Sequence, residues 1–103
     1  MRRSVVAAAV LLLAACAGGV DESEKDAAVA AARAAYQNAK AEGVDFTNGP
    51  CLGEIMDNWV ADVAHDPRQD VDDDPANQCE AYRSGEADHF VELDPDGKLI
   101  RAE

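Results

Sequence analysis

The sequence predicts one small α+β domain, in which a long N-terminal helix and a short second helix pack on a three-stranded, mostly antiparallel sheet. An alanine-rich segment with helix-capping residues covers positions 22–42, and short alternating segments follow at 59–65 and 89–101. Two cysteines in the second half of the chain, Cys51 and Cys79, can join these parts. We expect the folded domain to span residues 22–103, with the sheet ending in a hairpin.

The first element is the helix over residues 22–42. Asp21 or Ser23 can cap its N-terminus, and Gly43 offers a stop after its last turn. Nine of the fifteen residues from 27 to 41 are alanine, and Tyr36 is among the few large apolar residues. The helix should therefore pack closely but weakly, either as a flank of the domain or as a stalk, and we favour the flank.

The middle of the chain predicts a loop, a strand and a short helix. Residues 44–53 form a loop signalled by Asn48-Gly49-Pro50, and a short turn follows at positions 55 and 56. The alternating run over 59–65 predicts a strand, although a helix over 54–65 is the alternative. An acidic loop covers 66–75, and a helix over 76–84 ends at Gly85.

The last part of the chain predicts a β-hairpin. Two alternating runs, 89–93 and 98–101, flank the turn Asp94-Pro95-Asp96-Gly97. The expected core of the whole domain consists of its large apolar residues: Tyr36, Phe46, Leu52, Trp59, Val63, Tyr82, Phe90, Leu93 and Ile100.

Residues 1–15 have the order of a secretory signal, with Arg2 and Arg3 before an apolar run that ends in small residues. The segment Leu13-Ala14-Ala15-Cys16 resembles the lipobox of bacterial lipoproteins. That resemblance implies removal of the signal peptide, diacylglycerol and a fatty acyl chain such as palmitate on Cys16, and a tether over 16–21. It places the domain outside the cytoplasm, anchored to the cell membrane or outer membrane. An ordinary cleaved signal is the alternative, and the uncharged span is short for a transmembrane helix.

The cysteines and the charge fit an exported protein. If lipid occupies Cys16, Cys51 and Cys79 remain as an even pair, and we expect a disulfide between them, with free thiols or a metal site as alternatives. All 21 acidic residues follow position 20, so removal of the two signal arginines raises the excess of acidic over basic residues from 12 to 14. Such a surface excludes nucleic-acid binding and electrostatic attachment to anionic lipid.

Two weak candidates for metal binding arise from the acidic and histidine residues. Asp70, Asp72 and Asp74 have the spacing of the first ligands in an EF-hand loop, but the glycine and glutamate that complete the loop are missing. A looser Ca²⁺ site stays possible there. If the 59–65 and 89–93 strands pair antiparallel, His65 and His89 converge and could hold a transition metal or act as acid and base.

The sequence favours a non-enzymatic module that binds or scaffolds at the cell envelope. No nucleophile motif or phosphate loop is present, and we expect Arg68 and Arg83 to pair internally. Residues 45–101 are similar to small exported bacterial proteins, a resemblance that implies no activity. We expect the membrane, through the lipid, and an envelope protein or ligand as partners, and no resident cofactor. A divalent-cation-binding lipoprotein is the first alternative, and a small hydrolase is the second.

Overall fold

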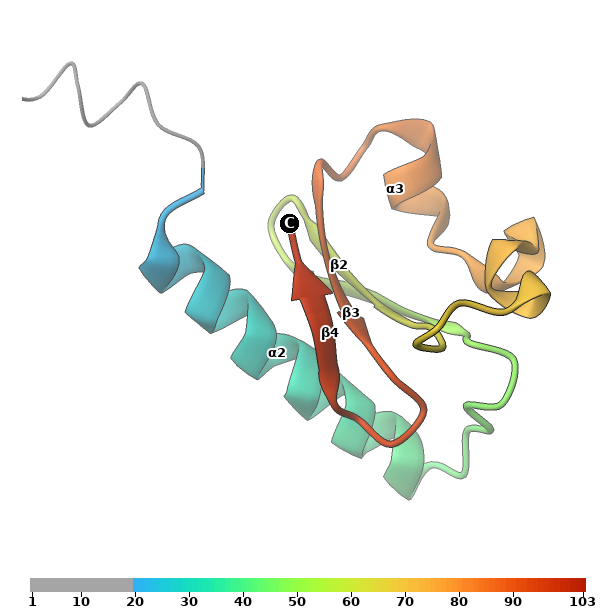
Figure 1. The fold of residues 1–103 in the computed structure, drawn as a ribbon. Helices are drawn as coiled ribbons and strands as arrows, with labels where there is room; N and C mark the ends of the chain where they lie inside the picture. The colour runs from blue at the N-terminus through green and yellow to red at the C-terminus, as the bar shows by residue number, and fades with distance from the viewer. Residues whose placement is uncertain (1–19) are drawn as a thin grey trace, which may run out of the picture.

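The computed structural model describes residues 20–103, which form a four-stranded sheet with a long helix on one face (Figure 1). The expected signal peptide 1–15, the expected lipidation site Cys16 and most of the expected tether 16–21 lie outside the described residues. Within residues 20–103, no helix combines the length and the apolar character that a membrane span requires.

Helix α2 (Glu22–Ala41) flanks the sheet, as predicted, and contacts all four strands. Asp21 caps it by accepting a hydrogen bond from the Glu24 N–H at 2.8 Å. Ala28, Ala32 and Tyr36 form its buried stripe. Because alanine side chains are short, the helix backbone can approach the sheet closely.

The sheet has four strands in the order β1-β2-β3-β4, not the three expected. Strand β1 (Cys51–Met56) pairs antiparallel with β2 (Trp59–Val63) through a two-residue turn, in which Asn58 has a φ of 70°. The predictions of a loop up to Gly53 and of a turn at 55–56 are therefore wrong. Gly53, Glu54 and two register irregularities hide the alternation of β1, whereas 59–63 is a strand as predicted.

Strands β2 and β3 (His89–Leu93) pair in parallel, so the sheet is mixed rather than mostly antiparallel. Trp59 lies opposite His89 and Val63 opposite Leu93. A parallel pair needs a long crossover connection, and residues 64–88 provide it. Strand β4 (Leu99–Ala102) then completes the predicted hairpin with β3, with Gly97 at a φ of 88° in the turn.

The crossover contains three short helical segments rather than one helix over 76–84. These are two 3₁₀ turns, η1 (Asp70–Asp73) and η2 (Pro75–Asn77), and the helix α3 (Glu80–Ser84), which ends at Gly85 as predicted. Gln78 and Cys79, both extended in ψ, separate η2 from α3. Cys79 forms a disulfide with Cys51, which confirms the predicted pair.

Two clusters of apolar side chains form the core, one on each face of the sheet. The larger lies between α2 and the sheet and contains Trp59 and Leu93; the smaller surrounds the disulfide on the outer face. Of the expected core residues, Tyr36, Trp59, Val63 and Leu93 are buried, and Phe46, Leu52, Phe90 and Ile100 are partly buried. Tyr82 is 45% exposed and was wrongly assigned to the core. It lies on α3, at the rim of the outer face.

Candidate functional site

The outer face of the sheet carries a hollow of about 400 Å³, between the strands and the crossover. Alternation along the strands determines which side chains reach it. Trp59, Ala61 and Val63 face α2, so Val60 and Asp62 face the hollow. The parallel register places Phe90 and Glu92 beside them, and the antiparallel register places Arg101 beside Glu92.

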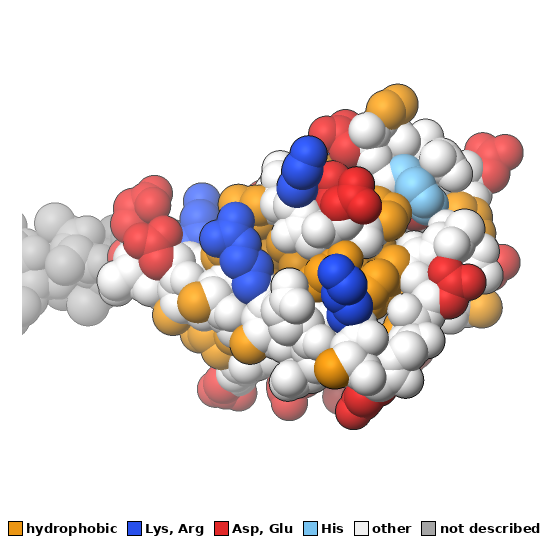
Figure 2. Space-filling view, turned by 90° about the horizontal axis from the view of Figure 1, so that it is seen from below, with side chains coloured by type: hydrophobic (Ala, Val, Ile, Leu, Met, Phe, Trp, Pro, Cys, Tyr) orange, Lys and Arg blue, Asp and Glu red, His pale blue; other side chains and the backbone are white. Residues whose placement is uncertain are grey.

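The crossover supplies the remaining wall of the hollow. Arg68 and Gln78 reach it from the segments around η1 and η2, Tyr82 and Arg83 from α3, and Cys79 forms part of its floor. Three arginines thus line one hollow in a chain whose net charge is −12. Figure 2 shows one face of the molecule, on which Lys and Arg side chains surround exposed hydrophobic ones and most acidic side chains lie toward the edges.

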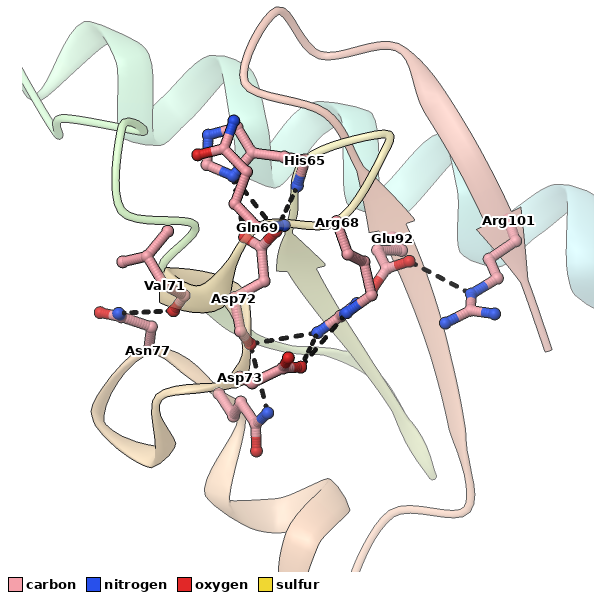
Figure 3. Close-up of polar contacts among 10 residues, drawn as sticks. His65, Arg68, Gln69, Val71, Asp72, Asp73, Asn77, Glu92 and Arg101 are labelled. Atoms are coloured by element: carbon pink, nitrogen blue, oxygen red, sulfur yellow. Dashed lines mark hydrogen bonds and ion pairs between the residues drawn. The ribbon is translucent and has the colours of Figure 1, made fainter.

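Glu92 is buried between two of these arginines (Figure 3). Arg68 donates from Nη1 to Glu92 Oε2 at 2.9 Å, and Arg101 donates from Nε to Glu92 Oε1 at 3.1 Å. Arg68 also donates to the Asp72 carbonyl and to Asp73. The expected internal pairing of Arg68 is confirmed, and the two guanidinium groups compensate the buried Glu92 charge.

Asp62 is the acidic residue of the hollow whose hydrogen bonding is incomplete. It lies beside Glu92 in the parallel ladder, and its enclosed Oδ1 has no hydrogen-bond partner among residues 20–103. Burial first, and then the neighbouring Glu92 charge, raise the pKa of Asp62 to about 7, although the Val63 N–H and then Arg68 oppose the rise. The side chain therefore exchanges its proton near neutral pH.

The other arginines keep donors available. Arg83 pairs with Glu80 through Nη1 at 3.1 Å, as expected for an internal pair, but both partners are exposed. Arg101 binds Glu92 only through Nε, and its guanidinium lies 5.4 Å from the centre of the Phe90 ring. Tyr82 and Phe90 meet edge to face at 5.0 Å and form an aromatic wall.

The predicted metal candidates do not converge. Because β2 and β3 are parallel, His65 and His89 lie at opposite ends of the pair, and the expected antiparallel meeting of the two is wrong. The His89 ring stacks on Trp59 at 4.8 Å instead. Within residues 20–103, no group of three or more His, Cys, Asp or Glu side chains is placed to hold a metal ion.

Two acidic residues of the crossover, Asp72 and Asp74, accept hydrogen bonds from the backbone of the crossover itself. Asp72 accepts hydrogen bonds from the N–H groups of His65 and Gln69 at 3.0 and 2.9 Å, and it contacts the His65 ring at 3.0 Å (Figure 3). Burial raises the pKa of Asp72, but these hydrogen bonds outweigh it and the net pKa is lowered. Asp74 caps η2, and Asp70 is exposed.

Sequence reasoning did not assign Asp62, Glu92 or Arg101 to a site. Alternation placed Asp62 on the face opposite Trp59, which was a usable signal. The partners across the sheet could not be identified without the strand order. Comparison of the chain with protein-family models, with curated proteins and with solved structures finds no match.

Proposed function

We propose that this protein is a lipid-anchored, extracytoplasmic binding module without enzymatic activity, and that its binding site is the hollow on the outer face of the sheet. The observation that carries the binding role is the hollow itself. It concentrates three arginines, an aromatic wall and a carboxyl with one unpartnered oxygen in an otherwise acidic domain. Its volume lies at the lower end of the range for small-molecule sites.

The site favours binding over catalysis and over cation binding. No serine, threonine or free cysteine side chain lines the hollow, so it offers no aliphatic hydroxyl or thiol nucleophile. In the crossover, the Asp72 carboxylate already contacts two backbone N–H groups and the His65 ring, and the residue is 3% exposed. It therefore has little capacity to coordinate Ca²⁺. The anchor rests on the lipobox resemblance of residues 13–16, and the domain is held to the membrane by the lipid alone.

Membrane fractionation tests the anchor. The full chain should take up a labelled fatty acid in a bacterial host and remain with the membranes, whereas Cys16→Ala should take up none and leave the lipid-anchored fraction. Serine at position 16 provides a second variant of similar size. Equal acylation of the parent and Cys16→Ala would contradict the proposed anchor.

Native mass spectrometry of the full chain, released from its own membranes in mild detergent, tests the binding role. A bound small molecule should accompany the parent and be lost from Arg101→Gln, which shortens the side chain and removes its charge. Arg33→Gln is the matched control, because Arg33 is an exposed arginine of α2 that does not line the hollow. Retention of the same molecule by Arg101→Gln would place its binding elsewhere.

A further inference from the structure

The unpaired groups of the hollow identify the ligand that would satisfy them. Arg68 already donates from Nε, Nη1 and Nη2 to protein acceptors. Within residues 20–103, by contrast, Arg101 makes a hydrogen bond only through Nε, with its Nη1 in a longer ion pair of 3.9 Å to Glu103, and Arg83 makes one only through Nη1. Their remaining N–H groups can bind a carboxylate, for which the guanidinium fork is well suited.

Asp62 requires the opposite kind of partner. Its carboxyl lines the same hollow, and its enclosed oxygen accepts no hydrogen bond from the described residues. Such a group is costly unless a donor or a cation reaches it. A ligand with only a carboxylate would leave Asp62 unpaired and bring another negative charge near it.

The strand registers place the two kinds of group within reach of one small molecule. Asp62, Glu92 and Arg101 lie in one row across β2, β3 and β4 on the same face. Two strand spacings separate the backbones of Asp62 and Arg101 by roughly 10 Å. The Arg101 side chain extends along this row toward Asp62, because its Nε donates to Glu92 between them, so one small molecule can reach both the guanidinium and the Asp62 carboxyl.

From this arrangement we propose that the hollow binds a zwitterion of the amino-acid class. Arg101 and Arg83 hold its carboxylate, Asp62 accepts from its ammonium group, and an apolar side chain packs on Tyr82 and Phe90. This inference rests on the proposed binding role and specifies its ligand. The cost of the unpaired Asp62 carboxyl is then relieved when the ligand is bound.

The pH dependence of affinity follows from the same contacts. The charges that act on Asp62 are those of Glu92 from β3 and of Arg68 and Asp72 from the crossover. Arg83 from α3 and Arg101 from β4 line the same hollow. Binding of an ammonium group selects the ionised carboxyl, whose fraction increases about tenfold between pH 6 and pH 8 when the pKa is about 7. Affinity for the zwitterion should therefore increase by a similar factor over this range. Affinity for a simple carboxylate should decrease.

Calorimetric titration of the full chain in nonionic detergent tests the inference with three related probes. L-phenylalanine carries both charges and an aromatic group, 3-phenylpropionate lacks the ammonium, and 2-phenylethylamine lacks the carboxylate. We expect phenylalanine to bind at least tenfold more tightly than either of the others. Arg101→Gln and Asp62→Asn should each weaken phenylalanine binding at least tenfold, and Asp62→Asn should not weaken binding of 3-phenylpropionate.

Matched controls are Arg33→Gln and Asp26→Asn, two exposed positions on α2 outside the hollow. Circular dichroism verifies that each variant is folded. If 3-phenylpropionate binds as tightly as phenylalanine and Arg101→Gln abolishes both, the hollow is an anion site. The zwitterion inference then fails while the binding role stands. Absence of heat with all three probes at millimolar concentration also overturns the inference. If native mass spectrometry in addition finds no Arg101-dependent adduct on the parent, the binding role fails as well.

Discussion

Asp62→Asn is expected to stabilise the protein at neutral and alkaline pH. The folded domain raises the pKa of Asp62 from 3.8 to about 7 through burial and the adjacent Glu92 charge. Between these two values the unfolded chain has lost the proton while the folded chain retains it. The contribution of Asp62 to the free energy of unfolding therefore falls as pH rises, and it is fully lost above about pH 7. Asparagine replaces the carboxyl with a neutral group of the same shape.

The magnitude follows from the size of the pKa shift. Because one pKa unit corresponds to about 1.4 kcal/mol, a shift from 3.8 to about 7 gives an upper limit of about 4 kcal/mol. Solvent reaches Asp62 from the hollow, and screening reduces the expected gain to about 2 kcal/mol. The gain should be present at pH 8 and absent near pH 3.5, where both states of the parent carry the protonated carboxyl.

Urea unfolding at several pH values measures this difference. Fluorescence of Trp59, the single tryptophan and fully buried, reports the transition with the disulfide intact. Asp26→Asn, on the exposed surface of α2, controls for the loss of one negative charge. If Asp62→Asn and the parent differ by the same unfolding free energy at pH 3.5 and pH 8, Asp62 is not destabilised by ionisation and the reasoning fails.

Three further predictions concern stability and use the same urea assay. Reduction of the disulfide, whose cysteines are 28 residues apart, should lower the free energy of unfolding by about 3.5 kcal/mol; an unchanged midpoint would contradict this. Gly97→Ala should cost about 2 kcal/mol, because φ is 88° and a Cβ would lie 2.8 Å from the Tyr36 ring. Gly43→Ala, with φ 84° and no atom within 4 Å, should cost only about 1 kcal/mol, and equal costs would exclude the Tyr36 contact as a cause. Asp72→Ala should cost about 3 kcal/mol by leaving buried N–H groups unpaired. The stability that Asp72 adds should be present above pH 3.8 and be lost as pH falls through its lowered folded pKa, so a cost that persists undiminished in strong acid would refute it.

The features that could be predicted from the sequence depend either on short-range residue patterns or on the number of cysteines left to pair. Caps and alanine content identify α2, the turn residues identify the β3–β4 hairpin, and an even number of remaining cysteines identifies the disulfide. Strand β1 was missed because Gly53 and Glu54 interrupt its alternation, and its pairing with β2 is irregular at two points. In the helix expected over 76–84, Tyr82 lies three residues after Cys79 and would share its inner face, whereas α3 begins only at Glu80 and leaves Tyr82 exposed.

The candidate site depends on information that no local pattern contains, namely the direction in which β3 runs beside β2. An antiparallel pair would bring His65 toward His89, and the chemistry would then be that of a histidine cluster. The parallel pair separates these residues and sets Asp62 beside Glu92, with Arg101 next to it on β4.

The same parallel pairing requires residues 64–88 to cross the outer face of the sheet, and this crossover carries Arg68 and Arg83 to the hollow. Strand direction thus determines both halves of the site at once. A register slip of one residue in β3 would turn Glu92 and Phe90 toward α2 and remove the Glu92 charge that helps to raise the pKa of Asp62. The part of the raised Asp62 pKa that comes from Glu92 therefore depends on the strand register, whereas the larger part comes from burial in the site. A pH-independent Asp62→Asn effect would count against both.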